Sequence, residues 1–163
     1  MKIKLLAGVL AGALTISMAL LSVSAAEIHE DSDPKTVEAV ITTSISPTYT
    51  VTIPADTSVT FNTLETSFGS IEVTAAQIDP DKCIRVTLTT DGELNNQADE
   101  AKVIPYAIND ANGDVFTSAD YLAVGDKTDL TINITQDDWN KAAAGAYTDT
   151  VTFTVSYENR TTN

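Results

Sequence analysis

The sequence predicts an all-β protein, an antiparallel β-sandwich of about eight strands with one short helical turn. The first observation is the segment from Tyr147 to Tyr157, in which apolar and hydroxyl residues alternate. Successive side chains of a strand point to opposite faces, so a period of two indicates a strand. The second observation is that short runs of this kind recur along the chain between turn residues, which is typical of a sandwich.

The elements follow from these patterns in chain order. Alternation predicts strands over residues 36–45, 49–53, 59–61, 71–75, 84–88, 104–108, 115–116, 121–124, 130–134 and 147–157. Asp91-Gly92 and residues 109–114 are expected to form turns, and residues 94–102 a loop. Thr135 is expected to cap a brief helix that Gly145 ends. In the last strand Val151, Phe153 and Val155 are expected to face the core.

The chain begins with the pattern of a secretory signal peptide over residues 1–26. Two lysines precede an apolar run, and small residues precede a break after Ala26, with Ala25 the next choice. The alternative, a retained membrane anchor, fits less well because acidic residues follow the run. We therefore expect residues 27–35 to form a flexible acidic leader, 36–158 a single domain and 159–163 a polar tail. The protein is then secreted, and it stays at a cell surface only through non-covalent contacts.

The charge of the chain limits its partners. The formal net charge is −14, and it becomes −16 when the two lysines of the signal are removed. Such a surface repels nucleic-acid backbones and anionic headgroups, so we expect no nucleic-acid partner and no direct membrane insertion after cleavage.

One turn resembles a metal site. Asp110, Asn112 and Asp114 have the spacing of the first three ligands of a calcium loop. The sixth position, however, is Val115 instead of glycine, and the twelfth is Tyr121 instead of glutamate. The cluster is therefore interpreted first as a hairpin turn, and no cofactor is predicted.

The sequence offers no evident catalytic group. The only histidine, His29, lies in the leader, and the only cysteine, Cys83, lies in a predicted strand and is read as a buried side chain. Asp149 lies on the apolar face of the last strand, where we favour a structural hydrogen bond over catalysis. A small carboxylate hydrolase remains a minor alternative, and the protein is expected not to be an enzyme.

The sole tryptophan, Trp139, suggests a second function. An exposed tryptophan beside acidic residues can stack on a sugar, whereas a buried one closes the end of a sandwich. We favour the second interpretation. A carbohydrate-binding or cell-wall-binding module is the alternative function.

The first alternating segment suggests a way to bind protein. Residues 36–45 present Val37, Ala39, Ile41, Thr43 and Ile45 on one side. This strand can close its own sandwich, or it can add to the edge of a neighbour, where the backbone gives affinity and alternate side chains fill pockets. We favour self-closure, because it requires no partner.

Several segments resemble a known family. Ala144-Gly145-Ala146-Tyr147-Thr148-Asp149-Thr150-Val151, continued to Tyr157, is similar to the C-terminal signature of spore coat protein U and pilin-like secreted domains of bacteria. Residues 104–110 and 69–73 resemble two earlier strands of that family, and residues 47–54 resemble secreted proteins of Gram-positive bacteria. The chain lacks the cysteine pair that is usual in pilins.

The resemblance implies an immunoglobulin-like sandwich that is secreted and serves as an adhesin or as a structural subunit of a fibre or coat. It brings no catalytic residues. We therefore expect a non-enzymatic extracellular protein that acts through protein partners or self-association, with a glycan as the alternative ligand.

Overall fold

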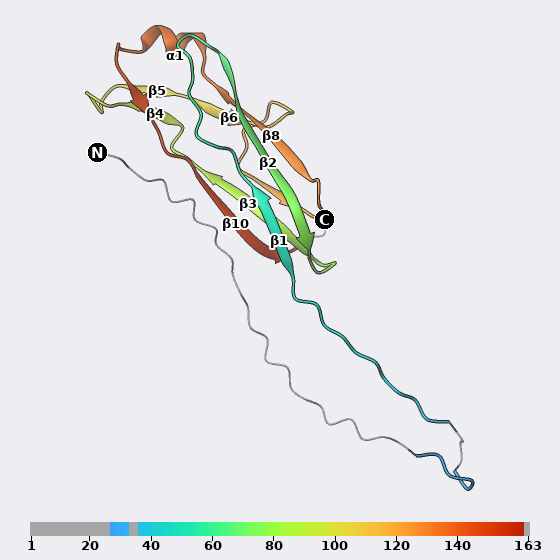
Figure 1. Ribbon diagram of the computed structural model, residues 1–163. Helices are drawn as coiled ribbons and strands as arrows, with labels where there is room; N and C mark the ends of the chain where they lie inside the picture. The colour runs from blue at the N-terminus through green and yellow to red at the C-terminus, as the bar shows by residue number, and fades with distance from the viewer. Residues whose placement is uncertain (1–26, 33–35, 162–163) are drawn as a thin grey trace. The chain divides into compact units, whose positions relative to one another are not determined.

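A computed structural model describes residues 27–32 and 36–161 of the chain. The predicted signal peptide, 1–26, lies outside the described residues. Among the residues that are described, no helix is long and apolar enough to cross a membrane. All strands and the helix lie within Ser44–Asn163, one of the two compact units of the chain (Figure 1).

The described residues are mostly β, with three small antiparallel sheets and one short helix. The first sheet has the order β1-β2-β8-β6; its strands are β1 (Thr48–Thr52), β2 (Glu65–Gln77), β8 (Lys127–Asn133) and β6 (Ala107–Asn109). The second sheet has the order β10-β3-β7; its strands are β10 (Thr152–Asn159), β3 (Lys82–Thr89) and β7 (Ser118–Tyr121). The third has the order β5-β4-β9; its strands are β5 (Val103–Pro105), β4 (Glu93–Asn96) and β9 (Tyr147–Thr148).

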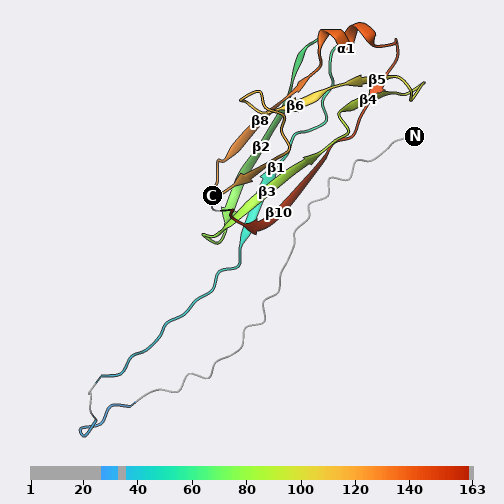
Figure 2. The ribbon, with the colours of Figure 1, turned by 180° about the vertical axis from the view of Figure 1, so that it is seen from behind.

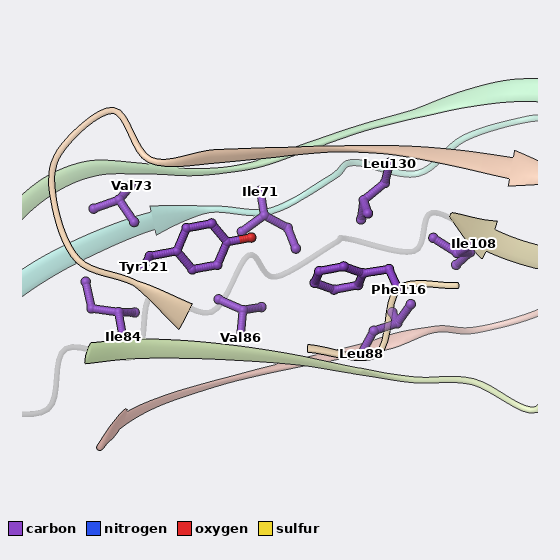
Figure 3. Packing of buried hydrophobic residues seen from close by; sticks show 9 residues of the cluster. All are labelled: Ile71, Val73, Ile84, Val86, Leu88, Ile108, Phe116, Tyr121 and Leu130. Atoms are coloured by element: carbon purple, nitrogen blue, oxygen red, sulfur yellow. The ribbon is translucent and has the colours of Figure 1, made fainter. Parts of the chain in front are cut away.

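The first two sheets pack their apolar faces against each other. Each contributes branched or aromatic side chains to one buried cluster, as Figure 3 shows: Ile71, Val73, Ile84, Val86, Leu88, Ile108, Phe116, Tyr121 and Leu130. Because alternate residues of each strand turn inward, β3 buries Ile84 and Val86 completely. Burial of this apolar surface holds the two layers together, since the chain has one cysteine and no intramolecular disulfide.

The helix α1 (Gln136–Lys141) begins as the sequence predicts. The Thr135 side chain accepts a hydrogen bond from the Asp138 amide at 3.2 Å, which satisfies one of the free amides of the first turn. The Trp139 side chain is buried with Ile104 and Ile134 in a second, smaller cluster. Its indole nitrogen donates to the carbonyl of Thr63 at 2.9 Å. The predicted turn at Asp91-Gly92 is also present, with Gly92 at φ +73°.

Several predicted elements differ from the structure. Residues 36–47 and 53–60 form no strand, and the predicted loop 94–102 contains most of β4. Of the predicted strand 121–124 only Tyr121 belongs to a strand, β7, and the predicted strand 104–108 is divided at Tyr106 between β5 and β6. The polar residues of β4 gave no apolar alternation, although their backbones pair with β5 and β9. The last strand is not continuous either: residues 149–151 separate β9, which pairs with β4, from β10, which pairs with β3.

The expected core face of the last strand is only partly buried. Val151 and Phe153 pack against the main cluster, whereas Val155 is 37% exposed. On the opposite face Thr152 and Thr154 are exposed, as the alternation predicts. This partial burial indicates that β10 lies at a margin of the core, and in Figure 1 β3 is its neighbour within the sheet.

Candidate functional site

A groove lies beside β9 and β10. It consists of two contiguous hollows of about 770 and 500 Å³, which share Thr57, Val59, Leu94, Thr148 and Asp149 in their linings. One wall is the extended segment 53–59 that follows β1, and the opposite wall is the segment from Tyr147 to Phe153. The groove therefore follows the chain across the break between β9 and β10.

The groove has apolar side chains at its floor, and hydroxyl and backbone groups contribute about half of its lining. Its deep side chains come from the strands of the first and third sheets and from α1: Phe68, Leu94, Ile104, Ile108, Ile132 and Trp139. Only two charged residues, Asp56 and Asp149, take part in the lining. An elongated groove of mixed lining with few charges suits an extended peptide, which offers both backbone groups and side chains, better than a small charged ligand.

The strand that borders the groove has a free edge. The Arg160 amide donates to the Asp81 carbonyl at 2.9 Å and extends the β10–β3 ladder, whose register pairs Asn159 with Lys82. Hydrogen-bonded pairs alternate along an antiparallel ladder, so the even-numbered residues of β10 bond to β3. The backbone groups of Phe153, Val155 and Tyr157 consequently point away from β3.

In β9, as in β10, the free backbone groups belong to an odd-numbered residue. The Gln97 amide donates to the Ala146 carbonyl at 2.8 Å, and the register pairs Asn96 with Tyr147. The backbone groups of Tyr147 therefore point away from β4. Within the part of the chain that the structure describes, no strand pairs with this edge of β9 or β10.

This edge has few of the features that normally prevent strand addition. Natural edge strands carry lysine or proline, or are covered by other elements. From Thr150 to Tyr157 there is neither a proline nor a charged residue. Residues 149–151, between β9 and β10, interrupt the edge. On both sides of this interruption the free backbone groups belong to odd-numbered residues. The edge can therefore accept an added strand.

Two aromatic rings outside the lining of the groove connect the first two sheets. Tyr49, near the start of β1, lies against Tyr157 of β10 with ring centroids 6.0 Å apart. The Tyr157 hydroxyl is held by Asp79, whose amide donates to it at 2.7 Å and whose carboxylate accepts from it at 3.0 Å. Figure 2 shows β1 and β10 from behind. The two sheets thus meet at these rings.

One end of the groove lies beside Trp139. Trp139 is only 7% exposed, while Phe61 packs on it edge to face at 5.5 Å and is itself 74% exposed. Trp139 thus plugs this end of the protein, the interpretation favoured from the sequence, and the exposed aromatic surface beside it belongs to Phe61. The sequence pattern placed Phe61 in a strand and did not identify it as a surface residue.

Asp149 lies where the two hollows meet. Its side-chain hydrogen bonds link three segments of the chain that each connect one sheet to another. Its carboxylate accepts hydrogen bonds from the Tyr106 hydroxyl, from the Thr90 hydroxyl at 3.1 Å and from the Thr150 amide at 2.6 Å. Thr90 lies between β3 and β4, Tyr106 between β5 and β6, and Asp149 between β9 and β10. Burial and the hydrogen bond to Asp149 raise the pKa of Tyr106 well above its usual range. These contacts support the structural role expected for Asp149.

The other residues singled out by the sequence lie apart from the groove. Asp110 accepts hydrogen bonds from the amides of Asn112 at 2.8 Å and Asp114 at 3.1 Å, as in a hairpin turn. Cys83 is completely buried, and burial is the main reason that its thiol pKa is raised. His29 lies outside every strand and helix, 3.4 Å from the Glu27 carboxylate.

Metal-binding clusters are also absent from the described ranges, 27–32 and 36–161, where no three histidine, cysteine or acidic side chains gather around a common point. The calcium prediction for Asp110, Asn112 and Asp114 stays a prediction, to be tested by titration. The carboxylate of Asp110 is already occupied by donors of its own turn.

The predicted strand over residues 36–45 is not formed. All its residues are exposed, and the apolar ones strongly so: Val37 48%, Val40 85%, Ile41 97% and Ile45 64%. Whether the segment closes its own sandwich or adds to a neighbour stays a prediction. Alternation alone could not reveal this, because a strand needs a partner and the sequence pattern does not specify one.

No family model matches this chain, and its sequence matches no curated protein.

Proposed function

We propose that this chain is a secreted, non-enzymatic module of the cell surface or extracellular space, which binds protein by strand addition. The observation that carries the proposal is the free edge of β9 and β10 beside a groove with apolar side chains at its floor. An added strand would pair with the free backbone groups and place alternate side chains in the groove. A structural or adhesive role follows, because such contacts join protein molecules without chemistry.

The fold and the resemblance to a known family support the same proposal. Two antiparallel sheets packed face to face are compatible with an immunoglobulin-like sandwich in which one edge is open. The C-terminal segment that resembles spore coat protein U and pilin-like domains forms the wall of the groove. Secretion rests on the signal-peptide pattern of residues 1–26.

Hydrogen exchange of the backbone amides tests this proposal whatever the partner is. In the purified monomer, the amides of Phe153, Val155 and Tyr157 should exchange quickly, whereas that of Thr154, which bonds to β3, should be protected. In material isolated from the surface of the producing cells, the three edge amides should also be protected. Rapid exchange of the edge amides in that material would show that the edge is not used.

A glycan is the second candidate ligand, and one observation favours it. The exposed ring of Phe61 lies at the rim of the larger hollow, next to Trp139 and the hydroxyls of Thr57 and Ser58. An aromatic face with nearby hydroxyls can hold a sugar ring. Soluble glycans should then quench Trp139 fluorescence in the wild type and not in a Phe61→Ala variant, and a glycan array without any binder would argue against this function.

A further inference from the structure

We propose that Asn112 is a site of spontaneous deamidation, at which the side-chain amide is converted to a carboxyl group through a cyclic imide. The inference is independent of the proposed function. Asn112 is followed by Gly113, and this is the only Asn-Gly pair of the chain. Glycine has no side chain, so its backbone nitrogen can approach the amide carbon of the preceding asparagine closely. Both residues are exposed, at the tip of the hairpin that follows β6.

The turn leaves the reacting groups accessible. The Gly113 amide makes one hydrogen bond within the turn, donating to the Asp110 carbonyl at 3.0 Å. Single bonds of this kind at the tip of an exposed hairpin open readily. Gly113 has a φ of +87°, and no atom beyond the adjacent residues lies within 4 Å of the place where a side chain would begin. A ring can therefore form between Asn112 and Gly113 without displacing the rest of the protein.

The reaction requires only water as a co-reactant. The Gly113 nitrogen loses its proton to hydroxide and attacks Cγ of Asn112. A bond forms between these two atoms and the bond from Cγ to Nδ2 breaks, so that ammonia leaves with a proton taken from water. Water then opens the ring at one of its two carbonyls. Opening at Cγ gives aspartate, and opening at the backbone carbonyl gives isoaspartate, in which the chain continues through Cγ.

The contacts of the turn indicate what the product would do to it. The Asp110 carboxylate accepts hydrogen bonds from the Asn112 amide at 2.8 Å and from Asn112 Nδ2 at 3.3 Å. Deamidation replaces the second of these donors with an oxygen that shares a negative charge. Two carboxylates then face each other, and like charges at this distance repel. The modified turn is therefore less stable, and each event adds a negative charge to a chain that is already acidic.

The residues on either side of the turn connect it to the core. Asn109 pairs with Val115, and the Phe116 amide donates to the Ile108 carbonyl at 2.8 Å. Ile108 and Phe116 both belong to the main buried cluster. Loosening of the turn should therefore lower the stability of the domain.

Peptide mapping by mass spectrometry tests the proposal on the purified secreted chain, incubated in mildly alkaline buffer made with heavy-oxygen water. Asn112 should gain one heavy oxygen and be found as both aspartate and isoaspartate, the two products of ring opening. Asn62 and Asn140 are internal controls, because both are exposed but are followed by residues larger than glycine. Asn112 should react at least about tenfold faster than either control.

A Gly113→Ala variant separates the effect of the glycine from that of local opening. The new side chain lies next to the reacting nitrogen and, because φ is positive, it also strains the turn. Deamidation should slow by about tenfold in this variant although its turn is less stable. Deamidation at the wild-type rate or faster in Gly113→Ala would overturn the proposal. Equal rates at Asn112, Asn62 and Asn140, or an absence of isoaspartate, would do the same.

Two variants of Asn112 test the effect of the product. Asn112→Asp places a carboxylate at the deamidated position, and Asn112→Ala removes the same hydrogen bond without adding charge. The melting temperature of Asn112→Asp should be lower than that of Asn112→Ala by about 3 °C at low salt, and the difference should shrink as salt screens the charges. Equal melting temperatures at low salt would refute the destabilising effect of the product.

Discussion

The contact between Tyr106 and Asp149 allows a quantitative test of the way the three sheets are held together. In Tyr106→Phe the Asp149 carboxylate loses one of three donors and keeps the Thr90 hydroxyl and the Thr150 amide. A hydrogen bond to a charged group contributes about 1.5 to 3 kcal/mol, and the remaining donors favour the lower end. We expect a loss of about 1.5 kcal/mol, or roughly 5 °C in melting temperature for a domain of this size.

The pH dependence of the stability provides a second test of this contact. The pKa of Tyr106 is raised in the folded protein, whereas in the unfolded chain it is near the ordinary value of about 10. Below that pH the contribution of Tyr106 is fully present. As the pH rises above it, the unfolded chain releases a proton that the folded protein keeps, and stability falls. The difference in stability between wild type and Tyr106→Phe should therefore be constant up to about pH 9 and shrink above pH 10.

Urea unfolding at pH 7, 9 and 10.5 measures this difference. Tyr49→Phe is a suitable control, because the Tyr49 hydroxyl makes no hydrogen bond within the described residues, and its effect should be small at each pH. Equal stability of Tyr106→Phe and wild type at pH 7, or a difference that does not shrink in alkali, would refute this account of the junction.

Three further predictions concern other parts of the molecule. Gly145→Ala should cost about 1 to 3 kcal/mol in urea unfolding, because the new Cβ would lie 3.1 Å from Cγ of buried Asn96; Gly113→Ala meets no neighbour and should lose only about 1 kcal/mol. Arg85 lowers the pKa of Asp120, so this ion pair stabilises the protein above about pH 4 and less as the pH falls. In Arg85→Gln the stability measured by urea unfolding should therefore decrease less steeply below about pH 4. Because the chain carries a large negative charge, self-association of the protein, measured by light scattering, should increase from 20 to about 300 mM salt. Binding of a basic partner should instead weaken over the same range of salt.

Local patterns were sufficient for the strands with strong apolar alternation and for the start of the helix. β3, β8 and the cap at Thr135 agree with the sequence, because alternation and capping depend on residues that are close together in the chain. β4 was missed because its pairing involves backbone groups of polar residues. Residues 36–45 were assigned to a strand because their alternation is strong, although they have no partner in the described chain.

The candidate site could not be predicted in the same way. Its walls are residues 53–59 and 147–153, which are almost a hundred positions apart, and its floor comes from several strands. Sequence analysis identified Asp149 and Trp139 as noteworthy, and both line the groove. It did not identify Phe61, whose exposure depends on where the segment after β1 lies.

The sequence by itself determined the β character of the chain, its acidity, its single cysteine and the alternation of residues 36–45 and 147–157. These properties depend on composition or on neighbours in the chain. Only the tertiary structure decided that 147–157 divides between two sheets, that its edge is free, and that 36–45 lies unpaired. The physical reason is that a strand's backbone groups are satisfied only by another strand, and which strand is present depends on the whole fold.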